Sequence, residues 1–212
     1  MHNAQVMLGA LFSYSPDGCV PLILALHIGM GLVRALASLH RAGFLHRFVT
    51  PYNFAIEVPF SLSKIAERML MIDLSLAKEW PAKPSYAAPF VGSPKYASVR
   101  VHREFNQAPA DDIISMLIVV AEFISGKLPW RAVIKDMRTL RKMKADFPKS
   151  AQFKRLPNEL RSLYRDMVKS PVYFMPDHHH ILDVFKSAIA RKDPEGRFEL
   201  PKWLVIHMMP RE

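Results

Sequence analysis

The sequence predicts an α+β domain that is mainly helical and carries a small antiparallel β element. Three observations predict this class. Two strongly apolar segments, at about 21–43 and 111–125, have helical length and are each closed by a glycine. Between them, residues 44–76 change to short apolar runs, which are typical of brief strands joined by turns. Beyond residue 130 the pattern becomes amphipathic with helical spacing.

Composition and charge limit the functional classes. The chain has 212 residues, of which 50% are hydrophobic and 23% charged, so we expect one globular domain over residues 1–212. Cys19 is the single cysteine and cannot form an internal disulfide, which favours the cytoplasm or nucleus. The net charge of +10 attracts acidic partners such as nucleic acid, anionic lipid or phosphorylated protein.

The first long segment is expected to be a buried helix. Pro21 suits a first helical position, Gly43 suits the residue just past the end, and apolar residues occupy nearly every face. The apolar part, residues 20–33, contains Pro21 and His27 and is shorter than the roughly 20 residues that a bilayer requires, so we expect no membrane span. The first residues have no basic region ahead of an apolar stretch, so we expect no secretion signal.

The remaining elements follow from shorter patterns. Residues 44–49, 53–58 and 68–74 are expected to be brief strands, whereas residues 77–110 hold five prolines and are expected to be irregular. Residues 111–125 are expected to form the most buried helix. Amphipathic helices are expected at about 131–145, 158–169 and 177–191, the last with Asp177 as its cap.

One segment carries a recognisable catalytic pattern. Residues 46–53 read His-Arg-Phe-Val-Thr-Pro-Tyr-Asn and resemble the catalytic loop of protein kinases, H-R-D-x-K-x-x-N. His46, Arg47 and Asn53 match that loop in type and spacing. Phe48 stands in place of its aspartate, and Thr50 stands in place of its lysine.

Four further elements follow in the order of the same family. Residues 71–78, M-I-D-L-S-L-A-K, resemble the metal-binding D-F-G-L-A-K segment, and residues 92–98, G-S-P-K-Y-A-S, resemble G-T-x-R-Y-A-S. Residues 111–130 resemble a D-D-L-E-S helix followed by G-x-L-P-W, and residues 156–177 resemble the closing helices. The chain is therefore similar to the casein kinase 1 and tau-tubulin kinase-like family over about residues 5–191, with residues 192–212 as a tail.

The resemblance implies a protein kinase-like fold of which only the C-lobe is present. It begins near the hinge between the two lobes, and neither a G-x-G-x-x-G loop, a β3 lysine nor an αC glutamate has a counterpart. We therefore expect the N-lobe to be absent.

The resemblance also implies an ATP-dependent serine/threonine phosphotransferase, but its chemistry is incomplete. Phe48 has no lone pair to accept a proton, although a positioned general base contributes about 10²–10⁴-fold. Thr50 lacks the cation that steadies the transferring phosphoryl group. We therefore expect a catalytically inactive domain. Asn53 and Asp73 keep metal-binding positions, so any remaining nucleotide binding would involve ATP and Mg²⁺ there; no other cofactor is expected.

Most of these residues also have purely structural interpretations. Asn53 could cap the loop turn, Asp73 could be a turn carboxylate, and His46 could be a packed core histidine. Asp112 resembles the helix aspartate that anchors the catalytic-loop backbone. The side chains of residues 178–180, three consecutive histidines, would point about 100° apart on a helix, so we expect no shared metal ion.

A basic stretch over residues 135–155 has two interpretations, a solvated face or a surface that recognises anions. Lys135, Arg138, Arg141 and Lys142 fall near one helical face, and the stretch also contains Lys144, Lys149, Lys154 and Arg155. Lys95 stands where the family often carries an Arg that contacts a substrate phosphate. Nucleic acid is a weaker candidate because aromatic residues are not interleaved with the basic ones.

Three functions are compatible with the sequence. The first is a pseudokinase that binds or scaffolds an acidic or phosphorylated protein, with Lys95, Arg138, Arg141 and Lys142 as the anion-binding residues. The second is a piece of a longer casein kinase 1-like kinase. The third is a basic module that binds nucleic acid or another polyanion. No membrane partner is expected.

Overall fold

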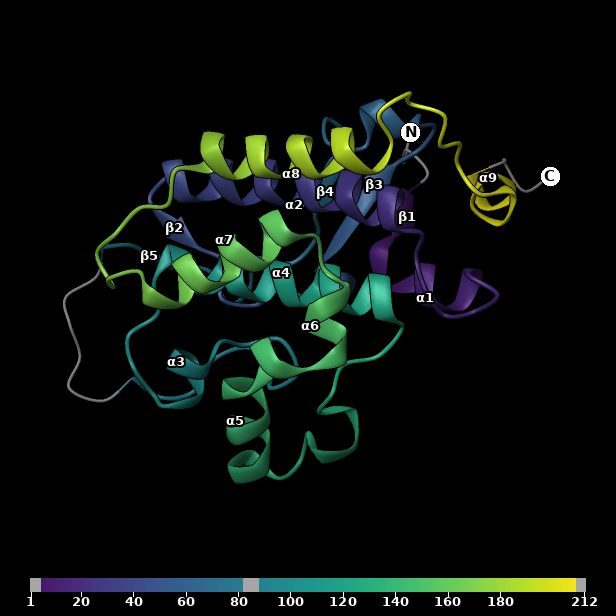
Figure 1. Ribbon diagram of the computed structural model, residues 1–212. Coiled ribbons are helices and arrows are strands. Elements are labelled where there is room, and N and C mark those ends of the chain that lie inside the picture. The colour runs from purple at the N-terminus through teal and green to yellow at the C-terminus, as the bar shows by residue number, and fades with distance from the viewer. Residues whose placement is uncertain (1–4, 82–87, 209–212) are drawn as a thin grey trace.

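The computed structural model describes residues 5–81 and 88–208. Long helices stack side by side, and two small antiparallel sheets lie beside them (Figure 1). The described α-helices are α1 (Leu11–Tyr14), α2 (Leu22–Arg41), α3 (Val99–His102), α4 (Pro109–Ser125), α5 (Met137–Ala145), α6 (Ala151–Arg155), α7 (Asn158–Lys169), α8 (His178–Lys192) and α9 (Lys202–Met208). The described strands are β1 (Gln5–Met7), β2 (Phe44–Leu45), β3 (Phe54–Glu57), β4 (Met69–Met71) and β5 (Lys78–Glu79).

Helix α2 packs against both α4 and α8 (Figure 1). Pro21 precedes its first residue, and Gly43 follows with a φ of 83°, a left-handed conformation that glycine adopts without strain. By length and composition alone α2 could cross a membrane, but core helices pass the same test and most of α2 is buried in the domain. The expectation that α2 is buried on every face is wrong in one respect, because Arg34, Ser38 and Arg41 are exposed.

Helix α4 runs through the centre of the domain (Figure 1). Sixteen of its 17 residues are buried, with Ile124 the exception, so the predicted deep burial is confirmed. It ends at Gly126, whose φ of 72° makes the left-handed cap that ends many helices. An aromatic cluster beside it is held by edge-to-face contacts, with ring centroids 5.2–5.5 Å apart, among Trp130, Phe147, Phe153 and Tyr164.

The two sheets frame the predicted catalytic loop. Strand order in the larger sheet is β1-β3-β4, with Val6 opposite Ile56 and Ala55 opposite Leu70. Strand β2 pairs with β5 and leads directly into residues 46–53, which β3 follows. The three predicted strands exist but are shorter than expected, and the antiparallel β element is confirmed.

Several of the described elements differ from expectation. Residues 131–145 were expected as one helix, but a 3₁₀ turn at Arg131–Val133 precedes α5 because Asp136 caps the new start, accepting from the amides of Arg138 and Thr139. The tail contains α9, which the sequence pattern did not predict and which packs on α1 and β1. Residues 77–110 are largely irregular where described, apart from β5 and α3, and residues 82–87 of this segment lie outside the described residues.

Candidate functional site

One buried carboxylate organises the predicted catalytic loop. Asp112, near the start of α4, accepts hydrogen bonds from the backbone N–H of His46 at 2.8 Å and of Arg47 at 2.9 Å. Its Oδ2 also lies 3.0 Å from Nε2 of His40, at the end of α2. Asp112 thus ties the loop to two core helices, which supports the predicted anchoring role.

Neighbouring Asp111 and Asp112 are both buried but differ in charge environment. Burial alone would raise the pKa of Asp112, but the hydrogen bond and charge of His40 and the other donors outweigh it and lower the pKa. At Asp111 burial has the largest effect and raises the pKa, although the charge of Arg100 and the hydrogen bond from Ser98 each lower it. Asp112 is therefore held as a carboxylate for the loop.

The backbone and side chain of Arg47 connect three separate segments. Its φ of 62° is left-handed, and its Nε donates to the carbonyl of Leu76 at 2.7 Å, in the segment 71–78. A Cβ placed on Gly92 would lie 2.6 Å from the Arg47 carbonyl oxygen, and Gly92 itself has a φ of 123°. Only glycine fits there, so the three segments that resemble kinase motifs meet at Arg47.

The two positions that carry the chemistry in kinases hold no charged group. Phe48 is half-buried, its N–H points to Nδ1 of His46 at 3.3 Å, and its carbonyl accepts from Nδ2 of Asn53 at 2.7 Å. Thr50 is buried, and its hydroxyl accepts from the N–H of Tyr52 at 3.3 Å, which caps a 3₁₀ turn. The loop keeps a closed backbone geometry, but its positions 48 and 50 carry neither a base nor a cation.

Asn53 and Asp73 show the structural contacts proposed for them. The amide of Asn53 closes the loop through Phe48, and Oδ1 of Asp73 accepts from the N–H of Ser75 at 2.8 Å. The hydrogen bonds from Ser75 are the main reason that the pKa of Asp73 is lowered. Asn53 and Asp73 offer oxygen donors of the kind that Mg²⁺ prefers, but too few to fill its six positions without phosphate oxygens and water.

His46 has the character of a packed core histidine. Its side chain is buried and stacks on Phe54 with ring centroids 5.1 Å apart. Burial lowers its pKa more than the charge of Asp112 raises it. Its Nε2 is buried and has no hydrogen-bond partner among residues 5–81 and 88–208. No group of three or more His, Cys, Asp or Glu that could hold a metal occurs in those ranges.

Lys95 is already paired. Its Nζ lies 2.6 Å from Oε1 of buried Glu122, which also accepts from the hydroxyl of Tyr96 at 2.6 Å. The carbonyl of Lys95 accepts from Nε1 of Trp130 at 2.9 Å. These contacts fix the segment 92–98 on α4, and an anion at Lys95 would have to compete with Glu122.

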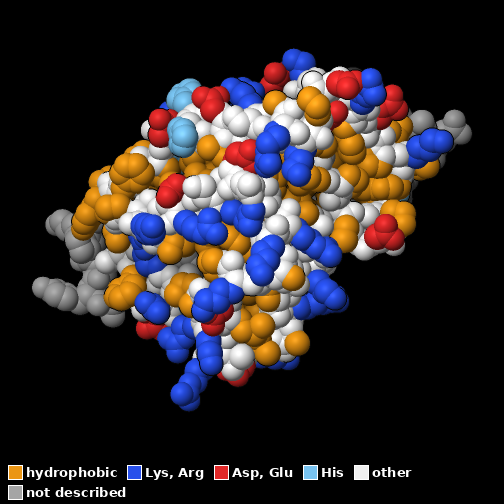
Figure 2. All heavy atoms as spheres, viewed as in Figure 1, with side chains coloured by type: hydrophobic (Ala, Val, Ile, Leu, Met, Phe, Trp, Pro, Cys, Tyr) orange, Lys and Arg blue, Asp and Glu red, His pale blue; other side chains and the backbone are white. Residues whose placement is uncertain are grey.

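The basic stretch is divided between interior and surface. Lys144 points inward: its Nζ donates to the carbonyl of Ala97 at 2.6 Å and lies 5.2 Å from the centre of the Trp130 ring. Burial lowers its pKa well below the usual value. Arg138, Arg141 and Lys142 are exposed on α5. Figure 2 shows Lys and Arg side chains gathered over the part of the molecule formed by α5, α6 and α7.

His40 and His178 are a pair that the sequence analysis missed. Nδ1 of His40 lies 2.9 Å from Nε2 of His178, the first residue of α8, so the contact to Asp112 continues as a buried chain of three side chains. The two histidines are 138 residues apart, and no local spacing could indicate their contact. The sequence signal at this place was the Asp177 cap, which accepts from the N–H of His180 at 3.0 Å.

The model of the protein kinase domain family matches residues 6–197. The chain belongs to the protein kinase family. A serine/threonine-protein kinase of Dictyostelium discoideum is 31% identical over 159 residues, 71% of this chain and 31% of that protein. Two proteins described as casein kinase I are also similar: one of Caenorhabditis elegans, 27% identical over 170 residues (76% of this chain and 49% of that protein), and one of Encephalitozoon cuniculi, 29% identical over 115 residues (51% and 36%).

These comparisons confirm the resemblance to casein kinase 1-like kinases. The chain spans between 31% and 49% of the length of these curated relatives. The expected absence of the N-lobe, the loss of catalysis and the binding of ATP and Mg²⁺ stay predictions.

Proposed function

We propose that this chain is a catalytically inactive, casein kinase 1-like serine/threonine kinase domain that acts by binding another protein. The observation that carries the proposal is Phe48. It occupies the position of the catalytic aspartate in a loop whose backbone is otherwise closed and anchored.

The chemical argument rests on what phosphoryl transfer requires. Such transfer depends on positioning and on neutralising charge, with a carboxylate accepting the proton of the substrate hydroxyl. Phe48 accepts no proton, a loss of about 10²–10⁴-fold for the base alone. Thr50 uses its hydroxyl to cap a turn and brings no positive charge to the phosphoryl group.

The proposed binding surface is the exposed basic face of α5, formed by Arg138, Arg141 and Lys142. Of the four predicted anion-binding residues, Lys95 is paired with Glu122, and the other three are exposed. Arg can bind a phosphate through two parallel hydrogen bonds, which suits an acidic or phosphoserine-containing protein. Binding should weaken with salt, because the Debye length falls from about 10 Å at 0.1 M to about 3 Å at 1 M.

A capture experiment tests this surface. A phosphoserine peptide immobilised on beads should retain the wild-type chain and lose the variant with Arg138→Glu, Arg141→Glu and Lys142→Glu. The matched control, Arg103→Glu, Lys127→Glu and Lys202→Glu, changes the same number of exposed charges elsewhere and should bind normally. Equal capture of the triple variant and wild type would overturn the surface, and competition by low micromolar DNA would favour a nucleic-acid module instead.

Nucleotide binding is tested by the melting temperature with ATP and Mg²⁺ or Mn²⁺. A ligand at 100 times its dissociation constant stabilises by about 2.7 kcal/mol, which is readily measured. We expect no metal-dependent shift. A shift that Asp73→Ala abolishes would instead support the alternative of a longer kinase, of which this chain would be a part.

A further inference from the structure

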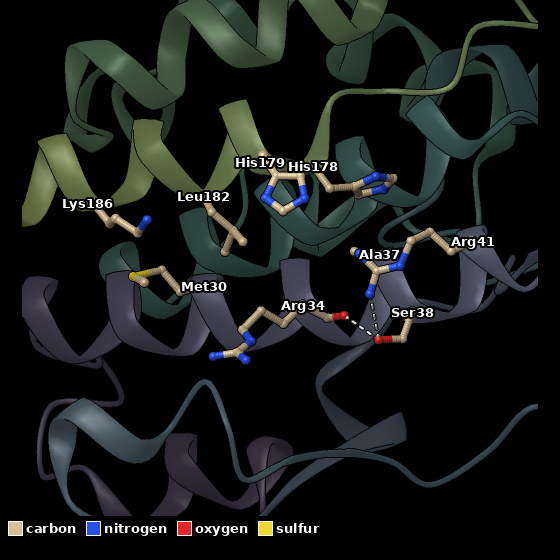
Figure 3. A pocket seen from close by; sticks show the side chains of 9 residues that line it. All are labelled: Met30, Arg34, Ala37, Ser38, Arg41, His178, His179, Leu182 and Lys186. Carbon is tan, nitrogen blue, oxygen red and sulfur yellow. Dashed lines mark hydrogen bonds between the residues drawn. The ribbon is translucent and has the colours of Figure 1, made fainter.

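A hollow lies between α2 and α8 (Figure 3), and none of residues 46–53 lines it. It has a cavity volume of about 380 Å³. Its lining residues are Met30, Arg34, Ala37, Ser38 and Arg41 from α2 and His178, His179, Leu182 and Lys186 from α8. The α2 side of the hollow carries the exposed Arg34, Ser38 and Arg41, which the sequence pattern failed to indicate.

The charged side chains that line the hollow are all positive. Arg34, Arg41 and Lys186 carry positive charge, and none of the lining residues is Asp or Glu. Figure 3 shows Arg41 and Lys186 reaching into the hollow from opposite ends, with the His179 ring between them. The lining therefore carries an excess of positive charge that favours an anion, although Asp183 pairs with Lys186 and the charge of Arg34 also acts on Glu67.

The existing contacts of these cations are weak. Arg41 Nη2 is 3.5 Å from Ser38 Oγ, the limit of a hydrogen bond. Lys186 pairs with Asp183 at 2.8 Å, but both side chains are more than 60% exposed, and such surface pairs contribute little. The cations are therefore available to a ligand at small cost.

The spacing of the cations along the hollow indicates the class of ligand. Arg34 and Arg41 are seven residues apart, about 10.5 Å along the helix axis, so one phosphate cannot easily contact both. Long side chains that approach from two ends suit an anion with at least two phosphate groups. Guanidinium groups bind phosphate oxygens in pairs, which favours phosphate over chloride.

The wall of the hollow is connected to the catalytic loop. His178 contacts His40, His40 contacts Asp112, and Asp112 accepts the amides of His46 and Arg47, each contact being 2.8–3.0 Å. Since the Asp112 carboxylate only accepts, His40 donates to it from Nε2, and Nδ1 of His40 shares a hydrogen bond with Nε2 of His178. The charged or titratable groups around His178 are Asp177 and His179 on α8, and His40 and Arg41 on α2.

We infer that this hollow binds a small molecule with two or more phosphate groups, and that His178, His40 and Asp112 transmit its binding to the backbone of the catalytic loop. The inference is independent of whether the domain transfers phosphate. His178 lines the hollow beside Arg41, and burial is the main reason that its pKa is lowered to about 4, so its ring is uncharged near neutral pH. A ligand that displaces this ring should therefore alter its contact with His40 and, through Asp112, the hydrogen bonds to the loop amides.

Amide chemical shifts provide the test, with inorganic pyrophosphate as the probe and chloride added to hold ionic strength constant. We expect saturable shifts at Ser38, Arg41 and His179, tighter for pyrophosphate than for inorganic phosphate, together with shifts at His46 and Arg47. Shifts that rise linearly without saturation, or equally with chloride, would overturn the site. Saturation at the hollow without any shift at the loop would overturn the transmission.

Two variants separate the steps. Arg34→Gln with Arg41→Gln replaces exposed side chains and should weaken pyrophosphate binding at least tenfold, whereas the control Arg103→Gln with Lys202→Gln should not. His178→Phe removes the contact with His40 but keeps the three cations, so at saturating pyrophosphate the response at His46 and Arg47 should be lost. Unchanged binding in the first variant, or an unchanged loop response in the second, contradicts the inference.

Discussion

The groups that hold the catalytic loop in place are all present, whereas the two loop positions that would perform the chemistry are substituted. The holding groups are complete: Asp112 accepts two loop amides, Arg47 reaches Leu76, and Asn53 closes the turn. The reacting positions hold Phe48 and Thr50. A buried carboxylate contributes to folding whether or not the loop is active, whereas a catalytic base contributes only to the reaction. The comparison suggests that folding alone is sufficient to explain which groups remain.

The largest expected effect comes from Asp112→Ala. The change leaves two loop amides and His40 Nε2 without their buried acceptor, and breaking such a buried charged network costs about 3–5 kcal/mol. Urea unfolding measures the loss.

Asp73→Ala serves as the matched control for this variant. Its carboxylate accepts only locally, from Ser75, so the change should have little effect on the free energy of unfolding. If the two variants unfold alike, the distinction between holding and reacting groups is lost.

Val119→Asp tests whether α4 is the buried central helix of the domain. Val119 is 1% exposed, and an unpaired charge there should cost about 3 kcal/mol, well above the roughly 1 kcal/mol of a typical substitution. Ile124→Asp, at the half-buried position of the same helix, should cost less. A melting temperature within a degree or two of wild type for Val119→Asp would show that the architecture is wrong.

Acid should weaken the holding groups selectively. The pKa of Asp112 is lowered in the folded state, so its contribution is present above the unfolded value near 3.9 and is lost as the pH falls through the folded pKa. The pKa of Asp111 is raised, so its ionisation opposes folding at neutral pH. Asp112→Asn should thus lose more stability than Asp111→Asn at pH 7, and the gap should narrow toward pH 3. Urea unfolding at both pH values measures this, and a gap that widens in acid would reverse the assignment.

The smallest effect is expected at Lys144. Burial lowers its pKa, so the unfolded state binds more protons and stability should rise with pH through the window between the folded and unfolded values. Lys144→Met keeps the apolar contact with Trp130 but removes the proton, at a net change within about 1 kcal/mol. Its stability should be flatter than that of wild type between pH 7 and pH 9. Parallel slopes would show that Lys144 does not titrate in this window.

Much of the fold could be predicted because its signals are local. Helices α2 and α4 each combine apolar length with a closing glycine, and Asp177 marks the start of α8. The start of α5 was predicted too early, because Asp136 caps the helix there and the residues before it form a separate 3₁₀ turn. Helix α9 is short, and its position depends on long-range contacts such as the stacking of His207 on Tyr14.

The residues of the candidate loop could be predicted from the sequence, but their tertiary partners could not. The spacing of His46, Arg47 and Asn53 indicated the loop, and Asp112 was assigned as its anchor from the same resemblance. Pairing partners were not predictable, because Lys95 meets Glu122 and His40 meets His178 through the tertiary fold. Burial of Lys144 was missed for a similar reason, since its acceptor is the Ala97 carbonyl, 47 residues away.

The most direct test of the central claim is a phosphoryl-transfer assay on the purified chain with ATP and Mg²⁺, using casein, tubulin and the chain itself as acceptors. We predict no transfer above the level of Asp73→Ala, and none from Phe48→Asp with Thr50→Lys, because the chain carries no G-x-G-x-x-G loop to cover the phosphates. A metal- and ATP-dependent signal from the wild-type chain that Asp73→Ala abolishes would contradict the account.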